Sequence, residues 1–192
     1  MPFYKSPVHA VYNLSNVNRS TDAIIHCSDG KYASIKKEIA TKCKFIELND
    51  DEEIPEFEYP MAVLDTLCSW TEKYGMDGVA ESDIVRPCVY RNVLYVLKSK
   101  WDAEFFESRL GNESNVGYYL QTINAAEKYN MKGLYDLLCL GLGCKVRNDD
   151  EEEIIHKVMG VPEDVEITSE DLENTSIRYP WLQEAIKPVV RK

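Results

Sequence analysis

The sequence predicts an α+β fold, with short β-strands between residues 23 and 57 and helices over most of the remainder. The clearest sign is an Asp-Gly step between two short β-prone runs, at residues 23–27 and 31–35, which is the strongest short-range signal for a β-hairpin. Apolar residues then recur at helical spacing from residue 61 onward. Hydrophobic residues form 44% of the 192 residues, which is enough for a packed core.

The chain is acidic, with 33 Asp and Glu residues against 22 Lys and Arg, a net charge of −11. This charge argues against a face that binds nucleic acid and against an anionic membrane surface as a partner. No apolar run approaches the roughly 20 residues that cross a bilayer. The first residues also lack the apolar segment of a secretory signal. We therefore expect a cytoplasmic or nuclear protein without nucleic-acid or membrane partners.

The predicted strands lie near the start of the chain. Residues 1–21 are rich in Asn, Ser and Pro, and we expect a tail with a short ordered piece around Val8 to Leu14. The hairpin is followed by a short helix over residues 36–42. Residues 49–58 form an acidic loop that leads to a short strand near Ile54 to Phe57.

Pro60 marks the start of a helix, because a proline at the first helical position loses no hydrogen bond. The helix is expected to run to about Tyr74, and Gly75 and Gly78 end it. We interpret Trp70 as a core residue. The apolar positions of this helix lie on two stripes: Met61, Leu64 and Cys68 on one, and Val63, Leu67, Trp70 and Tyr74 on the other.

Residues 83–97 are rich in Val, Leu and Tyr, and their periodicity does not distinguish a strand from a helix. A disordered segment of this composition would be prone to aggregation. We therefore expect it to be ordered and packed on this domain or on a partner. Trp101 to Glu107 is typical of a short helix.

Two longer helices are predicted over residues 116–128 and 131–144, from apolar residues at i, i+3, i+4 and i+7 spacing. The second is apolar nearly all round, so either both faces are covered by this chain or one face awaits a partner. Acidic residues at 149–153 suit a helix N-terminus. Thr168 begins a capping sequence, and Pro180 opens a last helix.

No enzyme is indicated. The motifs of a nucleophilic serine, a zinc protease, a phosphate-binding loop and a dinucleotide site are missing from the sequence. His9, His26 and His156 are expected in the tail, in a strand and on a charged helix face. The six cysteines are scattered without a C-x-x-C pair, so we expect free thiols, several of them buried. We expect no catalytic residue, no metal site and no cofactor.

Six short motifs occur in a distinctive order. They are the Ile24–Tyr32 hairpin with its Ser-Asp-Gly turn, Ile54-Pro55 with the helix that carries Trp70, the segment Trp101–Phe105, the helix junction Ala125–Asp136, the acidic Glu152–Ile154 and the late Trp181. This order resembles the Skp (S-phase-kinase-associated) adaptor family of SCF ubiquitin ligases. The resemblance covers roughly residues 23–75 and 101–185.

The resemblance implies a BTB/POZ fold, a small sheet flanked by helices, with a C-terminal helical extension. The implied organisation is a tail over residues 1–21, a BTB/POZ-like domain over 22–112 and an F-box-binding extension over 113–192. In the family, the BTB/POZ part binds a cullin, and the C-terminal helices clamp the F-box of a substrate receptor. The implied function is a non-catalytic adaptor between an F-box protein and a cullin in the ubiquitin pathway.

The resemblance also implies site residues. The extension would bind an F-box by a helix-in-groove mode. The residues implied for F-box binding are Leu120, Ile123, Leu134, Leu138, Leu142, Val146 and Trp181. The first six would divide between the core and the F-box groove, and Trp181 would close the groove. For Trp181, core packing remains as open as a contact with a partner. The residues implied for cullin binding are Glu127, Lys128 and Asn130.

The chain departs from the family at three places. Glu127-Lys128 replaces an Asn-Tyr pair at the cullin contact, so we expect weak or no cullin binding. Residues 83–97 are apolar where the family has an acidic, Pro-rich loop. Tyr179-Pro180 replaces Asn-Gln before Trp181, which alters the start of the last helix.

Two functional interpretations follow from this pattern. The first is an SCF adaptor. The second is a Skp-like protein that binds F-box-type partners in a structural or regulatory complex without a cullin. Adaptors similar to Elongin C are near relatives of the first, but they lack the long C-terminal helical extension.

Overall fold

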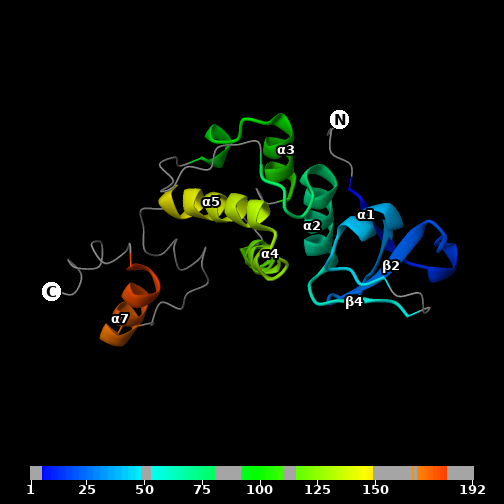
Figure 1. The fold of residues 1–192 in the computed structure, drawn as a ribbon, viewed down its shortest axis with the longest axis horizontal. Helices are drawn as coiled ribbons and strands as arrows, with labels where there is room; N and C mark the ends of the chain where they lie inside the picture. The colour runs from blue at the N-terminus through cyan, green and yellow to red at the C-terminus, as the bar shows by residue number, and fades with distance from the viewer. Residues whose placement is uncertain are drawn as a thin grey trace. The chain divides into compact units, whose positions relative to one another are not determined.

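The computed structural model describes residues 6–48, 53–80, 92–109, 116–148, 166 and 168–180. The chain divides into two compact units, Met1–Asp150 and Glu151–Lys192. The predicted α+β fold is confirmed, with a four-stranded mixed sheet and several helices in the first unit (Figure 1). The described helices are α1 (Lys37–Lys42), α2 (Met61–Tyr74), α3 (Lys100–Arg109), α4 (Val116–Lys128), α5 (Lys132–Asn148) and α7 (Ser169–Arg178), with the short helices η1 (Leu14–Asn16) and η2 (Val93–Tyr95).

The sheet has the strand order β1-β3-β2-β4 and is built around the predicted hairpin. β2 (Asp22–Cys27) and β3 (Tyr32–Lys36) pair antiparallel, and β4 (Glu56–Phe57) lies parallel to β2 at one edge. β1 (Val8–Val11) pairs antiparallel with β3 at the other edge. The segment expected to be a tail with a short ordered piece therefore contributes an edge strand of the sheet.

The Ser-Asp-Gly turn of the hairpin also caps α2. Gly30 has a φ of 74°, a conformation that residues with a side chain rarely adopt. The Asp29 carboxylate accepts the backbone N–H of Met61 at 3.3 Å and a hydrogen bond from Lys31 at 2.8 Å. Because a negative charge at a helix N-terminus is stabilising, this turn ties the hairpin to the first turn of α2.

α2 is enclosed on every side, and all nine residues from Val63 to Thr71 are buried. The sheet and α1 lie to one side of it, and α3, α4 and α5 lie to the other (Figure 1). Both predicted apolar stripes therefore have partners within the first unit. Helical residues begin directly after Pro60, one residue later than predicted, and the helix ends at Gly75, whose φ is 76°.

Aromatic side chains join α2 to α3. Trp70 is fully buried, as predicted for a core residue, and its ring centroid lies 5.8 Å from that of Phe105. Trp101 stacks on Phe105 at 4.9 Å. The Tyr74 hydroxyl donates to the buried Asp102 carboxylate at 2.6 Å. The short helix expected near Trp101 is confirmed as α3.

Asp65 on α2 is a buried carboxylate that holds two distant segments. The Ser6 hydroxyl donates to it at 2.7 Å, and Arg109 at the end of α3 forms an ion pair with it. Burial raises the pKa of Asp65, while Ser6 and Arg109 oppose that rise. The residues before β1 and the end of α3 are thus attached to one position of α2.

Residues 92–97 include the end of the apolar segment 83–97, whose periodicity did not distinguish a strand from a helix. η2 places Val93 in the core, and Val96 and Leu97 are also buried. The prediction of an ordered segment packed on this domain is confirmed for residues 93–97. Residues 83–91 lie outside the described residues.

α4 and α5 pack closely on the first unit. An added Cβ at Gly141 of α5 would come within 2.5 Å of the Phe106 ring, so these helices need a glycine at this position. The Tyr119 hydroxyl of α4 donates to the Leu138 carbonyl at 2.7 Å. Both helices were predicted. They group with the sheet in the unit that extends to Asp150, and α4 packs on α2.

α7 belongs to the second unit. The Thr168 hydroxyl accepts the N–H of Asp171 at 3.2 Å, and the Asp171 carboxylate accepts the N–H of Thr168 at 3.0 Å. The predicted capping sequence is therefore confirmed as a capping box. The helix expected after residues 149–153, with His156, and the course of the chain after Pro180 lie outside the described residues.

Leu67→Ala in α2 should lower the free energy of unfolding by about 2–5 kcal/mol, because the fully buried side chain would leave a cavity at the centre of the unit. Urea unfolding followed by circular dichroism measures this loss. Glu72→Ala, at an exposed position of the same helix, should change it by less than about 0.5 kcal/mol. Equal losses in the two variants would contradict the central place of α2.

Candidate interaction surface

The junction between α4 and α5 is a turn fixed by backbone hydrogen bonds. Asn130 has a φ of 56°, a left-handed conformation that Asn tolerates better than most residues. The N–H of Met131 donates to the carbonyl of Ala126 at 2.8 Å, and that of Asn130 to Glu127 at 3.0 Å. This is the pattern of a Schellman motif, anchored by the fully buried Met131. The turn leaves Glu127, Lys128 and Asn130 exposed, so the three residues implied for cullin binding share one corner of the first unit.

Lys128 and Tyr129 both contact the carboxylate of Glu58, which follows β4. The Lys128 Nζ lies 2.5 Å from a Glu58 oxygen, and the Tyr129 hydroxyl donates to the carboxylate at 2.7 Å. The hydrogen bond from Lys128, and then that from Tyr129, lowers the pKa of Glu58. The same contact raises the pKa of Lys128. A charge-assisted contact thus joins the α4–α5 corner to the segment after β4.

Tyr129 also packs on three other rings, and we call Phe45, Phe57, Tyr59 and Tyr129 the aromatic cluster. The Tyr129 centroid lies 4.7 Å from that of Phe45 and 6.1 Å from that of Phe57, and Tyr59 meets it edge-on at 6.3 Å. Burial, and then the hydrogen bond to Glu58, raises the pKa of Tyr129. The hydroxyl therefore remains a hydrogen-bond donor at neutral pH.

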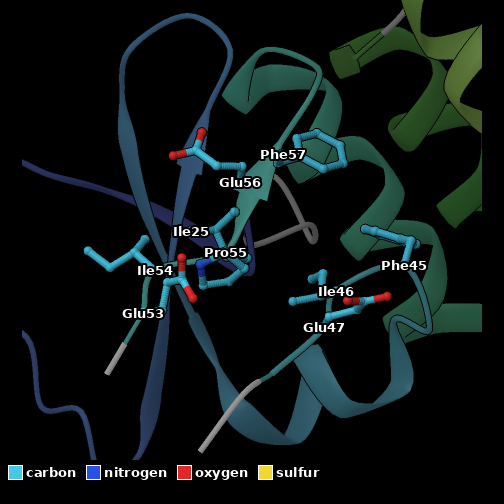
Figure 2. A pocket seen from close by; sticks show the side chains of 9 residues that line it. All are labelled: Ile25, Phe45, Ile46, Glu47, Glu53, Ile54, Pro55, Glu56 and Phe57. Carbon is cyan, nitrogen blue, oxygen red and sulfur yellow. The ribbon is translucent and has the colours of Figure 1, made fainter. Parts of the chain in front are cut away.

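A cavity of about 330 Å³ lies beside the aromatic cluster, and Phe45 and Phe57 belong to both (Figure 2). Its apolar lining includes the buried side chains of Ile25, Ile46 and Phe57. The half-buried Ile54 and Pro55 extend this lining toward solvent. Three exposed glutamates complete it: Glu47, Glu53 and Glu56.

The three glutamates differ in their partners. Glu56 pairs with His26, whose Nδ1 lies 2.9 Å from a carboxylate oxygen. Among the residues that the structure describes, the side chains of Glu47 and Glu53 have no ion-pair or hydrogen-bond partner. The cavity therefore combines an apolar interior with uncompensated negative charge at its mouth.

The positions implied for F-box binding do not form one exposed surface. Leu134 and Leu138 are fully buried in the core, so they cannot line an open groove in this structure. The apolar faces of α5 were expected either to be covered by this chain or to await a partner. At Leu134 and Leu138, the face is covered by this chain. Leu120, Ile123 and Leu142 are half-buried, which leaves part of each side chain accessible. The side chains of the other two, Val146 and Trp181, lie outside the described residues.

Two of the sequence-based expectations concern the cysteines and the possible metal ligands among the described residues. Burial raises the pKa of Cys27 to about 12, so this residue stays a thiol at neutral pH. Within the described ranges, no three His, Cys, Asp or Glu side chains are grouped to hold a metal ion. The cysteines among the described residues are Cys27, Cys43, Cys68, Cys139 and Cys144, and all but Cys139 are buried.

Two further observations complete the description of the surface. No helix in the part of the chain that the structure describes is both long and apolar enough to span a bilayer. Comparison with known proteins identifies neither a family model nor a curated protein that matches the chain.

Lys128→Ala should raise the pKa of Glu58 toward its ordinary 4.5, because the main group that holds it down is removed. The contact favours only the ionised carboxylate, so the stability it provides is present at neutral pH and is lost as the pH falls through the folded-state pKa. Carboxyl ¹³C NMR titration of Glu58 measures the change. Lys132→Ala, at an exposed position on α5, should leave the titration unaltered. A Glu58 titration that is the same in all three proteins would refute the contact.

Proposed function

We propose that this chain is a non-catalytic adaptor that bridges F-box substrate receptors to a cullin in an SCF ubiquitin ligase of the cytoplasm or nucleus. The observation that carries the proposal is that the four motifs within the described residues, which lie far apart in the sequence, meet at one helix, α2. The other two, Glu152–Ile154 and Trp181, lie outside the described residues. An adaptor needs a rigid body with separate binding surfaces, and it does not need a catalytic site. Because a fold by itself does not establish a function, the proposal depends on binding experiments.

Three of the described motifs contact α2 or the segment that follows it. The Ser-Asp-Gly turn caps the helix through Asp29. The segment that begins at Trp101 provides Phe105 and Asp102, which pack on and hydrogen-bond to α2. In the helix junction, a Cβ at Gly133 would come within 2.1 Å of the Gly78 carbonyl, so this position needs a glycine. The motifs are thus mutually dependent parts of one body, which supports a common origin with the adaptor family.

The exposed α4–α5 corner is the candidate surface for a cullin. It is fixed by the backbone turn at Asn130 and by the Lys128–Glu58 contact, so its residues are presented in a defined arrangement. The Lys128 ammonium must be desolvated, and its contact with Glu58 disturbed, if a partner buries this corner in an apolar contact. This cost favours weak cullin binding.

A second candidate function rests on the same observation. Without an effective cullin contact, the chain would bind F-box-type partners in a structural or regulatory complex. Leu120, Ile123 and Leu142 keep part of their apolar surface exposed and are the described candidates for that contact. The two proposals differ only in whether the α4–α5 corner binds a partner.

The direct test is to titrate the purified chain with an F-box peptide and, separately, with a cullin N-terminal domain. Calorimetry should detect the F-box peptide in both proposals. Sub-micromolar binding of the cullin domain would establish the first proposal and exclude the second. Binding of neither partner would refute both.

Restoring the family's pair with Glu127→Asn and Lys128→Tyr should strengthen cullin binding by at least tenfold, since an aromatic anchor in a buried contact contributes about 2 kcal/mol or more. The same calorimetric titration measures the change. Lys132→Tyr, which adds an aromatic residue at a nearby exposed position, is the matched control and should have no such effect. Equal affinity in the double variant and the wild type would show that the corner does not contact the cullin.

A further inference from the structure

We propose that the cavity beside β4 is a docking site for an extended segment of a partner protein that carries an aliphatic side chain next to Lys or Arg. The site lies on the sheet side of the first unit and is lined by β2, β4 and the segment after α1 (Figure 2). It does not use the half-buried leucines considered for an F-box or the exposed residues of the α4–α5 corner. The proposal therefore holds or fails independently of the adaptor function.

The size and lining of the cavity fit side chains of a peptide. Its volume of about 330 Å³ is at the lower end of the range for ligand pockets, roughly 300–1,000 Å³. Ile25 and Phe57 are almost fully enclosed at its inner side, and Ile54 and Pro55 are half-buried. An aliphatic side chain placed there would bury apolar surface on both partners, which is the main favourable contribution to such a contact.

The charge at the mouth selects a cationic partner. Glu47 and Glu53 are exposed, and among the described residues their carboxylates have no partner. Lys44, a cation next to this segment, lies 3.4 Å from Asp77 and is paired with that carboxylate instead. Charge complementarity therefore favours Lys or Arg beside the buried side chain and rejects acidic or phosphorylated segments.

The position of the cavity at the edge of the sheet favours an extended peptide over a small amine. β4 is the last strand in the order β1-β3-β2-β4, and its described pairing is with β2 alone. A segment that lies along an edge strand gains backbone hydrogen bonds, and its alternate side chains can enter pockets beside that strand. A single small cation would gain neither the backbone bonds nor most of the apolar contact.

Selection from a phage-displayed library of random linear heptapeptides on the immobilised full chain, at about 50 mM salt, tests the proposal. The enriched peptides should share an aliphatic residue next to Lys or Arg. A fluorescent peptide of the consensus sequence then gives affinities by polarisation. Glu47→Gln with Glu53→Gln should weaken binding roughly three- to tenfold, as expected for two partly exposed charges. Ile54→Ser should also weaken it, because the apolar lining is reduced.

The matched control is Glu170→Gln with Glu173→Gln, which makes the same change in net charge at exposed positions of α7. Its affinity should equal that of the wild type, and circular dichroism should show that all variants are folded. Enrichment of no peptide, or of peptides without a basic residue, would overturn the proposal. Equal weakening by the two double variants would overturn it as well, since the attraction would then come from the overall charge of −11.

Discussion

The burial of α2 from Val63 to Thr71 is the constraint on which the rest of the first unit depends. A helix enclosed on all sides needs a partner for every face, and the sheet, α1, α3 and α4 supply them. Its buried polar groups also need partners, and among the side-chain atoms of α2 Trp70 Nε1 is the one buried group without a hydrogen bond. Thr66 and Thr71 meet this need by donating to carbonyls one turn earlier in α2, at 3.1 and 2.9 Å. Asp65 meets it through Ser6 and Arg109.

The surfaces left for partners follow from this arrangement. Because α5 packs against the rest of the unit, the side chains of Leu134 and Leu138 contribute to its stability and are not accessible to a partner. Among the described residues, two accessible regions are the corner at Lys128, held in place by Glu58, and the cavity at the sheet edge, whose mouth is negative. The two regions share the aromatic cluster through Phe45 and Phe57, so a change at one of these rings would affect both.

Local chemistry in the sequence was sufficient to predict the hairpin, the limits of α2, the helices α3 to α5 and the cap of α7. The strand β1 was missed as a full strand because four residues are too few for an alternating pattern, and its stability comes from pairing with β3. The contact of Lys128 and Tyr129 with Glu58 was also missed, since it joins positions about seventy residues apart. The resemblance identified the positions Glu127, Lys128 and Asn130 of the α4–α5 corner in advance, but not their contact with Glu58. The burial of Leu134 could not be predicted, because an apolar residue on a helix looks the same in a core and in an open groove.

Native-state hydrogen exchange of the backbone amides tests the central place of α2 most directly. If the helix is the element to which the others attach, amides from Leu64 to Thr71 should exchange only through global unfolding and should be the slowest in the chain. Amides of α7, which has no buried residue, should exchange much faster. Exchange of the α2 amides through local opening, at a free energy well below that of global unfolding, would contradict the account.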